Sequence, residues 1–124
     1  MPSPKDYAAV RQVLENYIEG SYTADTVSLK SLFHLDSMMS GFIGDTLDIG
    51  TPQPFYDELE ESKSAKDSGD PYHGEIAFIH IAGPMASAGI VEDDLLGFNY
   101  VNHFHLLRID DAWKIISKIY TTVG

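Results

Sequence analysis

The second half of the chain constrains the fold most, because it consists of long strand-like runs separated by turns of two residues. Four runs are joined in pairs by Gly83-Pro84 and Asp110-Asp111, and they span residues 75–82, 85–92, 98–109 and 112–123. Both dipeptides suit tight chain reversals, so each pair is predicted to form a long antiparallel hairpin. A sheet of such strands needs a second layer to cover one of its faces.

The first part of the chain has the periodicity of helices. Ser3 is a good N-cap, Pro4 fits the first helical turn, and Gly20 is predicted to end the helix. Apolar residues three and four apart form one stripe, at Tyr7, Val10, Leu14, Tyr17 and Ile18. Asp25 is predicted to cap a second, short helix whose apolar side is Leu29, Leu32 and Phe33.

A shorter hairpin and a third helix complete the pattern. Residues 37–43 and 46–49 flank Gly44-Asp45, and Thr51-Pro52 then opens a helix with Phe55 and Leu59 one turn apart. Residues 62–71 are almost all polar or turn-forming and are predicted to be an exposed, mobile loop. The order ααββαββββ predicts one α+β domain over residues 1–124, with three helices covering a curved, mostly antiparallel sheet of about six strands.

Composition excludes several classes of function. The 124 residues include 19 acidic and 8 basic side chains, for a net charge of −11, which disfavours binding to nucleic acid phosphates. Cysteine is absent, so disulfides and thiolate chemistry are excluded. The longest uncharged stretch is interrupted by Gly83-Pro84 and is no membrane span. The first residues, 1–6, lack the apolar core of a secretory signal, and we expect a cytoplasmic protein.

The register of the last hairpin assigns side chains to the two faces of the sheet. A two-residue turn pairs Phe104 with Ser117, and alternation then places Tyr100, Asn102 and Ser117 on the apolar face. His103, His105 and Lys118 are expected on the opposite, outer face. Trp113 lies on the apolar face and is expected to be buried.

The same register weakens the metal signals in the sequence. His103 and His105 point the same way from a strand, but Lys118 would stand beside them, and a cation disfavours a bound metal. The run Glu92-Asp93-Asp94 is interpreted as a solvated loop, because three consecutive acids between strands do not converge on one ion. His80 is expected to point outward beside Ser87. We expect neither a metal ion nor a cofactor.

The order of elements and three motifs resemble the nuclear transport factor 2-like superfamily. The motifs are Tyr17-Ile18-Glu19-Gly20, Leu32-Phe33-His34 and the segment 104–115, Phe-His-Leu-Leu-Arg-Ile-Asp-Asp-Ala-Trp-Lys-Ile. Within it, the chain is most similar to the group called putative lumazine-binding proteins. The resemblance implies a cystatin-like, half-open barrel with an internal cavity, and frequently a dimer. Relatives include ketosteroid isomerases, scytalone dehydratase, epoxide hydrolases and polyketide cyclases, as well as proteins that only bind ligands or partners, so the fold alone does not decide the function.

Three functions remain open. The leading hypothesis is binding of a small organic ligand in an apolar, aromatic-rimmed cavity, with candidate contacts at Tyr17, Tyr22, Asp25, Phe33, Phe55, Ala88, Tyr100, Asn102, Phe104 and Ser117. The second is a cofactor-independent lyase or isomerase with Asp25 as base and Tyr22 or Tyr100 as donor to an oxyanion. Capping of the second helix is the simpler role for Asp25.

The third hypothesis is an interaction module that acts as a homodimer. The outer face is predicted to carry an apolar set of side chains, namely Phe78, Met85, Val101, Leu107, Ile116 and Tyr120. Exposed apolar patches of this kind usually mark an interface. We therefore expect a homodimer formed through the outer face of the sheet, with no nucleic acid or membrane partner.

Overall fold

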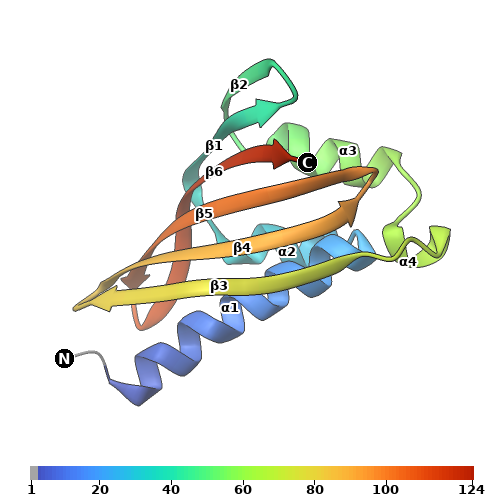
Figure 1. The fold of residues 1–124 in the computed structure, drawn as a ribbon. Helices are drawn as coiled ribbons and strands as arrows, with labels where there is room; N and C mark the ends of the chain where they lie inside the picture. Colours follow the sequence, from blue (N-terminus) through green and yellow to red (C-terminus); the bar gives the residue numbers. More distant parts are fainter. Residues whose placement is uncertain (1–2) are drawn as a thin grey trace.

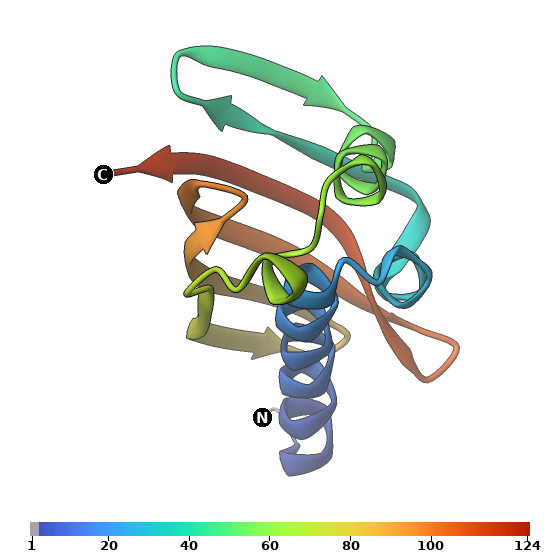
Figure 2. The same ribbon diagram turned by 90° about the vertical axis from the view of Figure 1, so that its right-hand side faces the viewer.

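A six-stranded sheet curves around the helices in the computed structural model of the protein (Figures 1 and 2). The strand order is β2-β1-β6-β5-β4-β3, and every neighbouring pair is antiparallel except β1 and β6, which are parallel. The elements are α1 Pro4–Thr23, α2 Thr26–Leu32, β1 Phe33–Ile43, β2 Thr46–Gly50, α3 Gln53–Glu61, α4 Ala65–Ser68, β3 His73–Ala82, β4 Met85–Leu95, β5 Phe98–Ile109 and β6 Ala112–Val123. This is the predicted α+β architecture, with an open rather than closed sheet. The structure describes residues 3–124, so Met1 and Pro2 of the N-terminal segment considered above lie outside it.

The first helix begins as predicted and ends later. Ser3 Oγ accepts a hydrogen bond from the backbone N–H of Asp6, which confirms it as the N-cap. Helix α1 continues past Gly20 to Thr23 and ends at Ala24, which has a left-handed conformation. Gly20 instead permits close packing, because a Cβ there would lie 2.8 Å from Leu29 Cγ. The expectation that Gly20 ends the helix is therefore wrong.

The segment predicted to be a loop contains a short helix. Ser64 caps α4 by accepting a hydrogen bond from the N–H of Asp67, and Gly69 ends it with a positive φ of 70°. Ala65 is fully buried beneath α1. The segment is therefore partly anchored, and the prediction of an exposed loop over residues 62–71 is wrong at Ser64 and Ala65, which are buried.

The last hairpin has the predicted turn but not the predicted register. Asp110 and Asp111 both adopt positive φ, 50° and 63°, as a two-residue reversal requires. Pairing is regular from the turn to Leu106 and Ile115, and then one extra residue, Ile116, enters β6 as a bulge. Beyond the bulge Phe104 pairs with Lys118, and Ser117 pairs with His105. The bulge reverses the faces of β6, so the predicted orientations of Ser117 and Lys118 are wrong.

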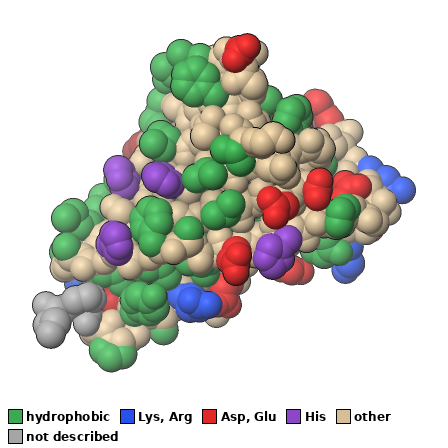
Figure 3. Space-filling view, in the orientation of Figure 1, with side chains coloured by type: hydrophobic (Ala, Val, Ile, Leu, Met, Phe, Trp, Pro, Cys, Tyr) green, Lys and Arg blue, Asp and Glu red, His purple; other side chains and the backbone are tan. Residues whose placement is uncertain are grey.

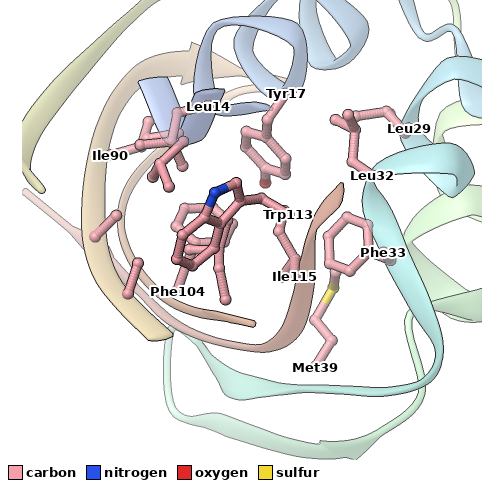
Figure 4. Close-up of a cluster of buried hydrophobic side chains, with 14 of the residues drawn as sticks. Leu14, Tyr17, Leu29, Leu32, Phe33, Met39, Ile90, Phe104, Trp113 and Ile115 are labelled. Atoms are coloured by element: carbon pink, nitrogen blue, oxygen red, sulfur yellow. The ribbon is translucent and has the colours of Figure 1, made fainter. Parts of the chain in front are cut away.

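The core lies between α1, α2 and the concave face of the sheet (Figure 4). Tyr17 projects from α1 toward this face, where its ring meets that of Phe104 edge-on at 5.0 Å. Trp113 is buried as predicted, and its indole N–H donates to Asp6 Oδ1 at 3.2 Å. Arg108 also donates to Asp6, and this contact is the main reason why the pKa of that carboxyl lies below its usual value.

The convex face of the sheet carries histidines among apolar side chains (Figure 3). The ring of Phe78 lies against His80 and His103, with centroids 5.1 and 5.3 Å apart, and both histidines are exposed as expected. Within residues 3–124, no group of three or more acidic or histidine side chains is arranged to hold a metal ion. In the same residues, no helix is long and apolar enough to cross a membrane.

Candidate functional site

A pocket of about 110 Å³ opens between α3, the β1–β2 hairpin and the C-terminal half of β6. Its walls are mostly apolar and aromatic, and its polar groups are few. The walls include Phe55, Leu95, Tyr100 and Tyr120. Asp48 and Glu58 add carboxylates to the lining, and Glu92 and Lys118 line it as buried charged residues. The volume approaches the roughly 150 Å³ of an engineered protein cavity that binds benzene, so the pocket has room for about one aromatic ring.

Lys118 occupies the floor of this pocket. The bulge in β6 turns its side chain inward, and only 5% of the residue is exposed. Nζ donates a hydrogen bond to Tyr17 Oη at 2.6 Å and lies 4.5 Å from the ring centroid of Phe55 and 5.2 Å from that of Tyr120. Aromatic faces stabilise a cation through their quadrupole, which partly replaces the lost water. Burial nevertheless lowers the pKa of Lys118 to about 8, against the opposing effect of Glu92.

Glu92 supplies a buried negative charge to the same floor. Its two carboxylate oxygens accept hydrogen bonds of 2.7 Å, one from Tyr72 Oη and one from Asn102 Nδ2. Only 1% of the residue is exposed. The interpretation of Glu92-Asp93-Asp94 as a solvated loop is therefore wrong for Glu92, because β4 extends to Leu95 and turns this side chain inward. Asp93 and Asp94 are exposed.

The tyrosines around the pocket stay protonated. Burial raises the pKa of Tyr17 and of Tyr100 well above the ordinary value, and the negative charges of Glu92 and Glu58 add to the effect. Burial and the carboxylate of Asp48 raise the pKa of Tyr120 in the same direction. These phenols therefore serve as hydrogen-bond donors at any ordinary pH.

The candidate residues from the sequence divide into three groups. Phe55 and Tyr100 line the pocket. Tyr17 accepts a hydrogen bond from Lys118, and Asn102 donates one to Glu92. Phe33, Ala88 and Phe104 are buried in the core, outside the lining. The remaining three are Tyr22, Asp25 and Ser117. Tyr22 stacks on Tyr72, Asp25 accepts a hydrogen bond from the N–H of Ser28 as the cap of α2, and Ser117 pairs with His105.

The strongest polar groups of the site were not among the candidates. Lys118 was assigned to the outer face and Glu92 to a loop. Lys118 faces inward only because Ile116 forms a bulge, and no local pattern in the sequence marks that bulge. The rim carboxylates of Asp48 and Glu58 are distant in sequence from both charges and carry no motif at all.

Comparison with solved structures defines the class of protein. A nuclear transport factor 2-like protein of unknown function from Shewanella baltica OS155 is 30% identical, with 100% of this chain and 98% of that chain covered and a TM-score of 0.89. A nuclear transport factor 2-like protein of unknown function from Methylobacillus flagellatus KT is 24% identical, with 99% and 96% covered and a TM-score of 0.85. The protein is thus a member of the nuclear transport factor 2-like, cystatin-like fold class.

The family is more specific than the fold. The chain belongs to the family described as "Putative lumazine-binding", whose profile matches residues 5–121. A more distant structure, described as a putative dehydratase from Streptomyces avermitilis, is 16% identical, with 97% of each chain covered and a TM-score of 0.69. None of the curated proteins matches this sequence.

Proposed function

We propose that the protein binds a small organic molecule in the pocket above Lys118 and Glu92. The observation that carries this proposal is the combination of apolar and aromatic walls with two buried charges on one floor, which is how ligand sites combine affinity with orientation. A ligand ring would contact Phe55 and Tyr100. Hydrogen-bond acceptors on the ligand would face Lys118, and donors would face the carboxylates of Glu58 and Asp48.

Lumazine is the first probe to test, because the family description names it. One of its two fused rings would fill the pocket, and the other would lie at the pocket's opening. We expect saturable binding in calorimetry, and we expect Tyr100→Ala to weaken it about tenfold through the lost aromatic contact. Tyr7→Ala is the matched control, since Tyr7 is an exposed tyrosine on α1 outside the pocket lining. An affinity unchanged in Tyr100→Ala, or lowered equally in Tyr7→Ala, would place the ligand elsewhere.

A cofactor-independent isomerase or lyase is the second candidate. Asp25, the base expected for such an enzyme, caps α2 and does not line the pocket, whereas Glu92 does. An enzyme in this pocket would therefore use Glu92 to remove a proton from the ligand. Deuterium exchange into a bound carbonyl compound, followed by NMR, tests this candidate. Exchange that is lost in Glu92→Gln with binding retained supports an enzyme, and binding without any exchange supports a binding protein.

A further inference from the structure

The amine of Lys118 has unused bonding capacity on the side of the pocket. A lysine ammonium has three N–H donors, and among the residues that the structure describes Nζ donates only to Tyr17 Oη. No carboxylate in residues 3–124 lies within ion-pair distance of it. The rings nearest to Nζ belong to Phe55, Tyr17 and Tyr120, and two of these, Phe55 and Tyr120, line the pocket. A ligand in the pocket therefore meets the amine directly.

We propose that Lys118 Nζ is a nucleophile that forms a reversible imine with an aldehyde or ketone group of the ligand, an inference that rests on the proposed function. The ammonium first gives one proton to water, and the neutral amine then attacks the carbonyl carbon. An N–C bond forms, the carbonyl π electrons move to oxygen, and one proton passes from the nitrogen to that oxygen. The hydroxyl of this carbinolamine takes up the proton that the ammonium released, the C–O bond breaks, and the oxygen leaves as water. The ammonium and the carbonyl compound thus give a protonated imine and one water, and the reaction needs no further reagent.

The neutral amine is available at ordinary pH because the site is desolvated. With a pKa of about 8, roughly one tenth of Lys118 is neutral at pH 7, compared with less than about 0.1% for a lysine at the ordinary 10.5. Burial of the amine in an apolar pocket is a known way to activate a lysine for imine formation. The aromatic rings around the amine also exclude bulk water, which favours loss of water from the carbinolamine.

The neighbours of Lys118 are placed to assist the same reaction. Tyr17 Oη lies 2.6 Å from Nζ and remains protonated, so it can accept a hydrogen bond from the amine and give one to the departing oxygen. The positive charge of the ammonium and that of the protonated imine are equal. The aromatic rings and the negative charge of Glu92 therefore stabilise the product as they stabilise the free lysine.

The chain contains an internal reference for this chemistry. The other lysines are Lys5, Lys30, Lys63, Lys66 and Lys114, and all are exposed except the half-buried Lys114. These five lysines do not line the pocket, so their amines react with an aldehyde without its help. Preference for Lys118 over these five amines is thus a direct measure of activation.

Reductive trapping with benzaldehyde, a one-ring aldehyde that suits the pocket volume, tests the proposal. Protein is incubated with benzaldehyde and cyanoborohydride from pH 6 to pH 10, and adducts are located by peptide mass spectrometry. We expect one adduct per chain at Lys118, formed about tenfold faster or more than at any other lysine at pH 7, with a rate that rises with pH around a midpoint of about 8. Adducts spread evenly over the lysines, or a midpoint near 10.5, would overturn the proposal.

Variants and a non-covalent analogue separate the chemistry from the binding. Lys118→Met should abolish the fast adduct, and Tyr17→Phe should slow it while keeping the ring. Lys66→Met, at an exposed lysine of α4, should leave it unchanged. Benzyl alcohol, which has the ring but no carbonyl, should compete with trapping. Competition or binding by benzyl alcohol without any Lys118 adduct would disprove the imine and leave the pocket intact. Failure of both benzyl alcohol and lumazine to bind would count against the proposed function itself.

Discussion

At the scale of single residues, the buried charges of Lys118 and Glu92 are the unusual feature of the molecule. Lysine and glutamate are almost never fully buried without partners, because the loss of water costs several kcal/mol per ion. Glu92 has two hydrogen bonds to compensate, while Lys118 has one hydrogen bond and three aromatic rings. A buried amine with unused hydrogen-bond donors lowers the stability of the fold. Proteins keep such groups mainly at functional sites.

The lowered pKa of Lys118 predicts a specific dependence of stability on pH. The unfolded chain binds this proton up to about 10.5 and the folded chain only up to about 8, so stability must rise with pH between these values. Denaturant unfolding should show a gain of about 2 kcal/mol from pH 8 to pH 10 in the wild type relative to Lys118→Met. Above pH 10 the raised pKa values of Tyr17 and Tyr100 act oppositely, since unfolding then releases their protons. A flat difference between the two proteins from pH 8 to pH 10 would disprove the assignment.

Truncation of Trp113 is expected to lower the free energy of unfolding strongly, because its side chain is packed in the core. The residue is 6% exposed, and it joins the core cluster beside Ile115 and Leu106. Trp113→Ala should destabilise the protein by about 3–5 kcal/mol, because the surrounding side chains only partly fill the cavity that remains. Denaturant unfolding measures the loss, and Leu35→Ala, at a residue that is 95% exposed, is the control with little expected effect. A loss below about 1 kcal/mol would contradict the burial.

At the scale of elements, the bulge in β6 decides what the pocket contains. Before Ile116 the strand turns Trp113 and Ile115 toward the helices, and after it the strand turns Lys118 inward. A regular strand would have placed Lys118 outside beside His103, in an exposed position with no influence on a ligand. Bulges commonly re-aim side chains next to functional sites, and this one does so by a single residue.

The parallel pairing of β1 and β6 also depends on one small residue. Gly41 faces Tyr120 across this pair, and a Cβ at position 41 would overlap the backbone carbonyl of Tyr120. Gly41→Ala should destabilise the protein by about 2 kcal/mol or more, because neither backbone can move without breaking the ladder. Gly50→Ala on β2 is the matched control, since no atom lies within 4 Å of a Cβ there. Thermal unfolding of the two variants compares them, and equal melting temperatures would show that the contact relaxes freely.

At the scale of the whole molecule, the two faces of the sheet differ in their roles. The concave face holds the core and the pocket, and the convex face exposes apolar side chains, among them Met85, Leu107 and Ile119. A shallow groove on this face is lined mostly by apolar side chains, including Phe42, Leu47, Ile49, Val101 and Ile119. Tyr120, assigned to the outer face from the sequence, lines both this groove and the inner pocket.

We propose that the convex face forms a homodimer, since apolar side chains exposed together on one face usually mark an interface. Ile119→Glu should dissociate it, because the charge would be buried in the contact without a partner. Light scattering at micromolar concentration measures the mass, and Val27→Glu is the control, at a residue of α2 that is 80% exposed. A wild-type mass near 13.7 kDa over a hundredfold dilution would disprove the dimer.

Local patterns in the sequence determine most of the architecture. The cap at Ser3, the cap at Asp25 and the turn at Asp110-Asp111 follow from the chemistry of neighbouring residues, and each was predicted and is confirmed. The burial of Trp113 and the exposure of His103 follow from alternation along a regular strand. These features depend on residues a few positions apart, so the sequence alone is sufficient for them.

Only the tertiary structure decides the site. Lys118 faces inward because β6 accommodates an extra residue while it pairs with β5 on one side and β1 on the other, and no local pattern marks that residue. Glu92 is buried because Tyr72 and Asn102, which lie 20 and 10 positions away, satisfy both of its oxygens. A buried charge is stable only where distant partners converge on it, and that convergence is a property of the folded chain.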